Sequence, residues 1–189
     1  MILQPTRHFT TAMLSESELK SRAENIKYFF TDVDGTLTDG TSYYSAEGEI
    51  MKRFSLRDGT GFYLLRQAGI IAGIISGENS PIVTVRATKL NLTHCYLGVA
   101  DKLEMIAKIC KAEHVEMNEI AYIGDDLNDL CLAGKVGLFL CPADSCEQTA
   151  ERSDYICRHK GGDGAFREAV EMLLKWKDIG ITECFLQYV

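Results

Sequence analysis

Apolar residues along this chain occur in short continuous runs, and these runs alternate with longer segments in which apolar residues recur every three or four positions. Continuous runs of about four to eight apolar residues predict buried strands, and the three-to-four spacing predicts amphipathic helices. The strands predicted in this way span residues 26–32, 70–76, 93–97, 120–125 and 136–140. The predicted helices span residues 15–24, 59–69, 80–90, 101–114, 128–134 and 166–176.

Local cap and turn residues add to this pattern. Ser15 followed by Glu18 is a capping-box pattern, which predicts that the first helix begins there. Pro81 suits the first turn of a later helix. The segments TSYY and EIMKRF flank the turn-like AEGE, and this arrangement predicts a β-hairpin over residues 41–54.

The order of these elements predicts an α/β fold. Strands that alternate with helices form a mostly parallel sheet with helices on both faces, which is the doubly wound arrangement. We expect one domain over residues 25–176. A loose N-terminal arm and the short first helix, residues 1–24, precede it, and an irregular tail, residues 177–189, follows it.

Composition narrows the classes of partner. The formal net charge of −7 argues against nucleic acid and anionic membranes. No apolar run approaches the roughly 20 residues that span a bilayer, and the N-terminus lacks the apolar core of a secretory signal. The seven cysteines include no C-x-x-C pair, which favours neutral thiols in a reducing compartment. We therefore expect a cytoplasmic protein.

Polar side chains follow three of the predicted strands where each strand ends. Asp32 and Asp34 end the first, Ser76 ends the second, and GDDLND follows the third. Because ligands of open parallel sheets bind outside the carboxyl ends of the strands, these side chains should converge. Clustered carboxylates repel one another unless a cation lies between them, and hard oxygen ligands favour Mg²⁺. The alternative is that single aspartates here serve as helix caps and turn formers.

A carboxylate beside Mg²⁺ can act as a nucleophile on phosphorus, which divides one difficult displacement into two easier ones. Asp34 lies two residues after Asp32, so its side chain points the same way if the strand stays regular. It could protonate a leaving alkoxide and later deprotonate water. A hydroxyl at Ser76 and an ammonium at Lys102 could bind the phosphoryl oxygens.

These residues resemble the motifs of the haloacid dehalogenase (HAD) phosphatase superfamily. TDVDGT resembles the first motif, and Ser76, Lys102 and GDDLND resemble the next three, in the same order. The resemblance implies that Asp32 is the nucleophile and Asp34 the general acid/base. It implies a Mg²⁺ site made by Asp32, Asp125 and the backbone carbonyl of Asp34. The remaining acids of GDDLND, Asp126 and Asp129, would support this metal site.

The spacing of the motifs leaves no room for a cap domain. Only the hairpin and one helix fit between the first and second motifs, and only a helix and a strand fit between the third and fourth. The segments DGTLTDG, FSLRDGTG, GVADK and KGGDGAFRE resemble capless phosphatases that act on 3-deoxy-2-ulosonic acid 8- or 9-phosphates. That group implies a homotetramer in which a neighbouring subunit completes each active site.

Two substrates compete within this group. Glu78, Lys89 and Pro142 resemble the enzymes for nine-carbon acid 9-phosphates of the sialic-acid type. FSLRDGTG and the chain length resemble the enzymes for 3-deoxy-D-manno-octulosonate 8-phosphate, an intermediate of lipopolysaccharide synthesis, and the eight-carbon acid is the one we favour. The substrate contacts implied by the resemblance are Ser55, Leu56, Arg57, Asp58, Gly59, Glu78, Arg86 and Lys102. Arg86 could equally be a solvated helix residue, and we interpret Gly61 as a turn former.

Two functions of other classes fit part of the pattern. A phosphorylation-switched receiver domain also has a doubly wound fold, a phosphoacceptor aspartate, Mg²⁺, a hydroxyl and a lysine. It lacks an acid/base at the position of Asp34, so its aspartyl phosphate is long-lived, whereas D-x-D favours turnover. A non-catalytic oligomerisation module is the second alternative, and the intact Asp32, Asp34 and Asp125 argue against it.

Overall fold

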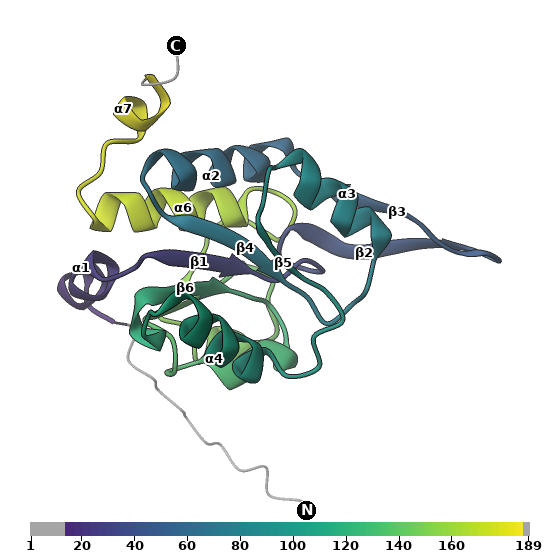
Figure 1. Ribbon diagram of the computed structural model, residues 1–189, viewed down its shortest axis with the longest axis horizontal. Coiled ribbons are helices and arrows are strands. Elements are labelled where there is room, and N and C mark those ends of the chain that lie inside the picture. The colour runs from purple at the N-terminus through teal and green to yellow at the C-terminus, as the bar shows by residue number, and fades with distance from the viewer. Residues whose placement is uncertain (1–13, 187–189) are drawn as a thin grey trace, which may run out of the picture.

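The computed structural model describes residues 14–186 and has a six-stranded parallel sheet as its central layer (Figure 1). The strand order is β5-β4-β1-β6-β7-β8, and each neighbouring pair is parallel. The strands are β1 (Tyr28–Thr31), β4 (Ile71–Ile75), β5 (His94–Tyr96), β6 (Ile120–Ile123), β7 (Leu138–Cys141) and β8 (Tyr155–Ile156).

Strand β1 lies inside the sheet and positions the first motif. Its register pairs Thr31 with Ile74 of β4 on one side and with Ile123 of β6 on the other. All four of its residues are buried, which agrees with its continuous apolar sequence. Asp32 therefore emerges directly between the ends of β4 and β6.

Helices cover both faces of the sheet, as a doubly wound fold requires (Figure 1). Buried residues of α1, α2, α3 and α6 share one core cluster with the sheet, and buried residues of α4 belong to a second cluster. The helices are α1 (Glu16–Glu24), α2 (Leu56–Gln67), α3 (Pro81–Lys89), α4 (Lys102–Glu113), α5 (Glu147–Ala150), α6 (Ala165–Trp176) and α7 (Ile181–Leu186). Two short 3₁₀ helices are η1 (Met117–Glu119) and η2 (Leu127–Leu132).

The predicted hairpin forms a separate two-stranded antiparallel sheet, β2 (Thr38–Ser45) and β3 (Gly48–Phe54), which projects away from the body of the molecule (Figure 1). Its outer part exposes large side chains, including Tyr44 and Ile50. Between Asp34 and Ser76 the chain forms only this hairpin, α2 and β4. Among the described residues no cap domain is present, as predicted.

The α/β class, the capping box at Ser15 and the hairpin are confirmed. Helix α2 begins at Leu56 and not at residue 59, because the Ser55 hydroxyl caps it by accepting from the N–H of Asp58. The interpretation of Gly61 as a turn former is wrong. It lies inside α2, where a Cβ would come within 3.0 Å of the Phe166 ring, so glycine permits close packing of α2 on α6.

Other differences concern short elements. The helix predicted at 128–134 is a 3₁₀ helix, and α5 and β8 were not predicted. The tail is not irregular throughout, because residues 181–186 form α7. The predicted arm lies outside the described residues except for Leu14. Across residues 14–186, every helix falls short of the length and apolar character needed to cross a membrane. The division of the chain at residues 24 and 176 stays a prediction.

Candidate active site

The carboxyl ends of β1, β4 and β6 surround a cavity of about 210 Å³. Its lining includes predicted residues from all three strand ends: Asp32, Asp34, Ser76, Glu78 and Asp126, together with Gly77 and Asn128. Three positions separated widely in sequence thus meet in one cavity. The prediction that the motifs converge is confirmed by this lining.

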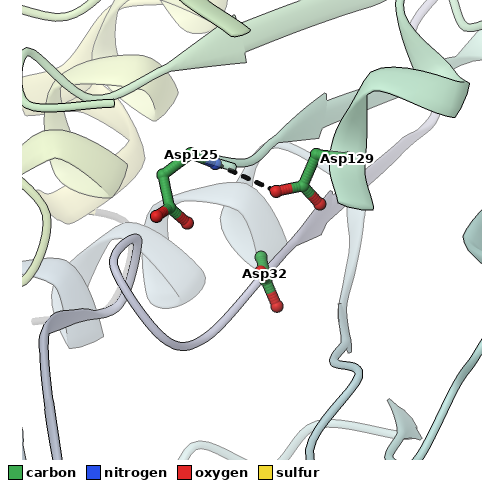
Figure 2. Close-up of side chains that lie close together, drawn as sticks. All are labelled: Asp32, Asp125 and Asp129. Carbon is green, nitrogen blue, oxygen red and sulfur yellow. Dashed lines mark hydrogen bonds between the residues drawn. The ribbon is translucent and has the colours of Figure 1, made fainter. Parts of the chain in front are cut away.

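Three carboxylates lie together at the base of this site (Figure 2). Asp32, Asp125 and Asp129 each offer an oxygen atom, and these atoms all lie within 4.8 Å of one another. Asp32 comes from the end of β1, whereas Asp125 and Asp129 flank the start of η2. Like charges at such distances repel one another, so the cluster requires cations close by.

Asp129 is fully buried, and its hydrogen bonds are saturated by the protein. Its Oδ2 accepts from the backbone N–H of Asp125 at 3.0 Å and of Asp126 at 3.3 Å. Its Oδ1 accepts from the Tyr122 hydroxyl at 2.7 Å and from Lys102 Nζ at 2.6 Å. This residue therefore organises the loop that carries Asp125 and holds Lys102 in place.

Lys102 supplies one of the cations that the cluster needs. Its side chain is 1% exposed, and Nζ lies 3.0 Å from Asp32 Oδ2 and 2.6 Å from Asp129 Oδ1. Burial alone would lower its pKa, but the charges of Asp32 and Asp129 outweigh burial and raise it. Lys102 begins α4, where a positive charge opposes the helix dipole, so these two carboxylates compensate that unfavourable position.

The positive charge of Lys102 alone leaves the cluster of Asp32, Asp125 and Asp129 with excess negative charge. Burial, followed by the charges of Asp32 and Asp129, raises the pKa of Asp125 to about 7. Burial and the Asp129 charge also raise the pKa of Asp32, despite the opposing effect of Lys102. The Thr36 hydroxyl donates to Asp125 Oδ1 at 3.0 Å, which satisfies one of its oxygens.

The donor set fits a hard divalent cation. Carboxylate oxygens are the side-chain donors that converge here, and among the described residues Asp34 Oδ2 is buried without a hydrogen-bond partner. An unpartnered buried carboxylate oxygen is costly unless a ligand or a cation approaches it. The orphaned oxygen and the raised pKa values both indicate that the site accommodates one more positive charge.

Lys52, a residue of β3 that contacts the site, was not among the residues predicted from the sequence. Its Nζ lies 2.5 Å from Asp34 Oδ1, and its side chain is 2% exposed. Tyr122 and Asn128 were also missed. Asn128 lies within GDDLND and could have been included with its neighbours, whereas Tyr122 looked like any other apolar residue of a buried strand.

Most of the remaining predicted substrate contacts line other cavities within one chain. A second cavity is lined by Leu56, Gly59 and Arg86. Ser55 lies beside it, because its carbonyl accepts from Arg86 Nη2 at 3.2 Å. Arg57 lines a third cavity together with Arg158, His159 and Arg167.

Asp58, the last of these predicted contacts, is 2% exposed. Its carboxylate accepts from the N–H groups of Gly164 at 3.2 Å and Arg167 at 2.8 Å. In this conformation Asp58 stabilises the N-terminus of α6 and does not line the acidic cavity.

The loop before α6, residues 157–164, packs against the backbone of the first motif, TDVDGT. The N–H of Gly162 donates to the Thr36 carbonyl at 2.9 Å. A Cβ on Gly161 would lie 1.8 Å from the Gly35 carbonyl oxygen. Glu168 anchors this loop by accepting from the N–H groups of Arg158 at 2.9 Å and His159 at 3.0 Å. The position of Asp34 thus depends on residues near the end of the chain.

Solved structures with the same fold include close matches to the whole domain. A 3-deoxy-D-manno-octulosonate 8-phosphate phosphatase from Moraxella catarrhalis, in complex with magnesium, phosphate and KDO, is 39% identical, with a TM-score of 0.86 over 92% of this chain and 99% of that one. A HAD-superfamily (subfamily III A) protein from Legionella pneumophila is 35% identical, with a TM-score of 0.86 over 90% of this chain and 95% of that one. The fold and the acidic site thus define a phosphoric monoester hydrolase of the HAD superfamily.

Curated relatives narrow this class further. No protein-family model matches the chain. The 3-deoxy-D-manno-octulosonate 8-phosphate phosphatase KdsC of Haemophilus influenzae is 38% identical over 157 residues, which is 83% of this chain and 87% of that one. KdsC of Escherichia coli strain K12 is 37% identical over 158 residues, 84% of each chain. This chain belongs to the 3-deoxy-D-manno-octulosonate 8-phosphate phosphatase family. These relationships favour neither the receiver domain nor the non-catalytic module.

Proposed function

We propose that this chain hydrolyses the phosphate ester of a 3-deoxy-2-ulosonic acid, with 3-deoxy-D-manno-octulosonate 8-phosphate as its substrate. The observation that carries this proposal is the contact between Asp32 and Lys102 at 3.0 Å, at the edge of a cavity that also contains Asp34 and Ser76. A nucleophile, an acid/base and two groups that bind phosphoryl oxygens are the parts that phosphate ester hydrolysis needs. The relatives named above act on this eight-carbon ester.

In this proposal Asp32, Asp125 and the backbone carbonyl of Asp34 hold the metal ion. Mg²⁺ bound there would neutralise the clustered carboxylates and offset the negative charge of the phosphoryl oxygens. Asp129 supports the site by fixing the backbone of Asp125 and Asp126, because its own oxygens are occupied by four donors. Asp126 lines the cavity and caps η2 by accepting from the N–H of Leu127 at 2.8 Å, and it would orient water.

The first step forms a bond between a carboxylate oxygen of Asp32 and phosphorus. The bond between phosphorus and the ester oxygen breaks, and a protonated Asp34 gives its proton to the departing alkoxide. Lys102 and Ser76 bind the phosphoryl oxygens, on which charge builds in the transition state. Because Lys102 is held by two carboxylates, its ammonium does not have to be reoriented during the reaction.

The second step releases phosphate. Asp34, now ionised, takes a proton from a water molecule, and that water attacks phosphorus of the aspartyl phosphate on Asp32. The acyl phosphate bond breaks, inorganic phosphate leaves, and the carboxylate of Asp32 and the proton on Asp34 are restored. The same carboxyl group thus serves both steps, which distinguishes turnover from the long-lived phosphorylation of a signalling domain.

We further propose that the enzyme is a cytoplasmic homotetramer whose active site is completed by a neighbouring subunit. Support for assembly comes from the exposed Tyr43, Tyr44, Ile50 and Met51 on the hairpin, and from Arg86 and Lys89, which line a groove apart from the acidic cavity. An anionic sugar acid needs cations near its carboxylate, and a second copy could supply them. All seven cysteines are free, which suits a reducing compartment.

The test is phosphate release from a panel of sugar acid phosphates by the wild type and by Asp32→Asn. We expect Mg²⁺-dependent release from the eight-carbon 8-phosphate, with loss of activity in the variant. A side-by-side comparison with nine-carbon 9-phosphates tests the substrate, since Glu78 and Lys89 resemble enzymes for those esters. Robust activity in Asp32→Asn, or a stable aspartyl phosphate without turnover in the wild type, would contradict the mechanism.

A further inference from the structure

Lys52 is a buried cation on a largely exposed hairpin. Its neighbours in sequence, Met51 and Arg53, are exposed, whereas the Lys52 side chain is 2% exposed and turns toward the body of the molecule. Burying an ammonium group is expensive unless acceptors satisfy it. Specific acceptors must therefore stabilise the ammonium group of Lys52 in this buried position.

The ammonium group of Lys52 has three N–H donors, and the structure provides three acceptors. Nζ lies 2.5 Å from Asp34 Oδ1, 2.8 Å from Glu49 Oε1 and 2.9 Å from Ser42 Oγ. Glu49 and Ser42 belong to the hairpin itself. Of these three bonds, the one to Asp34 therefore connects Lys52 to the loop that follows β1. All the donors of Lys52 are used, and its geometry is fixed from three directions.

This arrangement gives the two oxygens of Asp34 different surroundings. Oδ1 accepts from Lys52 and lies 3.5 Å from the Thr38 hydroxyl. Oδ2 is buried and has no partner among the described residues, and Asp34 lines the acidic cavity. A carboxyl group that is held through one oxygen presents the other in a constant direction. A proton bound to Oδ2 would be available to a group inside the cavity.

A purely structural role for Lys52 makes a different prediction. The hairpin is also tied to the body through Glu49, whose carboxylate accepts from the hydroxyl of Ser80, the residue that precedes α3. If Lys52 only attached the hairpin, Ser80→Ala would loosen the same attachment without removing a partner of Lys52, and it would have a similar effect on activity. If Lys52 instead orients Asp34, the two residues should differ.

We propose that Lys52 is a positioning residue for proton transfer: it holds Asp34 Oδ1 so that Oδ2 can protonate the departing alkoxide. This inference rests on the proposed role of Asp34 and adds a residue that acts through it. The effect should depend on how much the leaving group needs a proton. A sugar alkoxide needs one, whereas 4-nitrophenolate is stable without one.

The experiment compares kcat/KM for 3-deoxy-D-manno-octulosonate 8-phosphate and for 4-nitrophenyl phosphate in the holoenzyme with Mg²⁺. This parameter covers the steps up to the first irreversible one, in which the leaving group departs. The variants are Lys52→Met, Lys52→Gln and Ser80→Ala. The control is Lys108→Met, which removes an exposed lysine of α4 that pairs with Glu104 on the same helix. Lys52→Gln keeps an N–H donor and serves if Lys52→Met does not fold.

General acid catalysis contributes about 10²–10⁴-fold, so Lys52→Met should lose about 10²-fold with the sugar ester and less than about threefold with the aryl ester. Lys52→Gln should fall between Lys52→Met and the wild type, and Ser80→Ala should lose the same small factor with both esters. Equal losses with both esters in the Lys52 variants, or the same selective loss in Ser80→Ala, would overturn the inference.

Failure of the proposed substrate can be distinguished from failure of this inference. If the wild type hydrolyses other primary alkyl phosphates but not the sugar acid ester, the substrate assignment falls, and the Lys52 comparison is made with those alkyl esters. If the wild type hydrolyses no phosphate ester, the proposed function and the role of Lys52 fall together.

Discussion

Gly161→Ala adds one methyl group at a position where the loop before α6 meets the first motif. The new Cβ would lie 1.8 Å from the Gly35 carbonyl oxygen, 2.5 Å from its carbonyl carbon and 3.0 Å from the Thr38 carbonyl oxygen. These contacts are all with backbone atoms, which cannot rotate away as a side chain can. Either the loop or the segment after Asp34 must therefore move.

The size of the effect follows from this overlap. To reach an ordinary contact distance, the Gly35 carbonyl must shift by more than about 1 Å. Overpacking of this kind costs roughly 1–3 kcal/mol of unfolding free energy. Gly35 follows Asp34 directly, and a misplacement of about 1 Å at a reacting group can cost about 10²-fold in rate. We expect kcat to fall by that order while the protein stays folded.

The assay is steady-state phosphate release together with thermal unfolding of the same preparations. Gly180→Ala is the matched control, because the three atoms nearest its Cβ would all belong to the end of the Glu183 side chain, which can swing away. The control should keep wild-type activity. If Gly161→Ala keeps activity within about threefold and unfolds at the wild-type temperature, the loop does not restrain Asp34 as argued.

Two further predictions concern pH. Burial alone would raise the pKa of Glu168, but hydrogen bonds from His159, Arg158 and Tyr155 lower it to about 2. This stabilisation is present above pH 4.5 and is lost as the pH falls toward 2. Glu168→Gln should therefore lower the free energy of unfolding in urea by about 2–3 kcal/mol at pH 7 and by progressively less below pH 4.5. A loss that is independent of pH would contradict this prediction. The raised pKa of Asp125, about 7, means that the metal-free folded state binds extra protons. Its stability should therefore fall as the pH rises from about 4 to 7. Mg²⁺ competes with those protons, so it should raise Tm more at pH 8 than at pH 5.5. The measurement is thermal unfolding with Mg²⁺ and with EDTA as the reference. Equal shifts of Tm at both pH values would count against a metal site at Asp125.

Most of the fold could be predicted from sequence because the strands of the central sheet other than β8 carry their own signal. Strand β1, Tyr28–Thr31, is buried along its whole length, and its aromatic run shows the apolar continuity expected of such a strand. Helix α7 gave no comparable signal. It is six residues long, and its packing depends on Cys184, which is buried, and on the edge-to-face contact of Phe185 with Tyr63. Such short helices are stabilised by tertiary contacts and not by propensity.

The site could be predicted only where its residues share a motif. Asp32 and Asp34 follow the end of β1 closely, and for that reason both could be predicted from the sequence. Lys52 lies among exposed hairpin residues, and its charge is what a solvated strand would show. Its contact with Asp34 arises because Lys52 lies near the base of the hairpin, where the hairpin meets the site. Gly61 was misread for a related reason: the Phe166 ring that requires it belongs to a helix far along the chain.

The central place of β1 has a consequence for the order in which the molecule is built. Both of its neighbours are parallel to it, and the contact from Thr36 to Asp125 spans 89 residues. Closing a loop of that length costs about 4 kcal/mol of chain entropy before any contact is gained. A nascent chain therefore carries TDVDGT long before it carries a cation site, and a misfolded chain never acquires one. Divalent cation binding would thus report the fraction of molecules in a preparation whose sheet is complete.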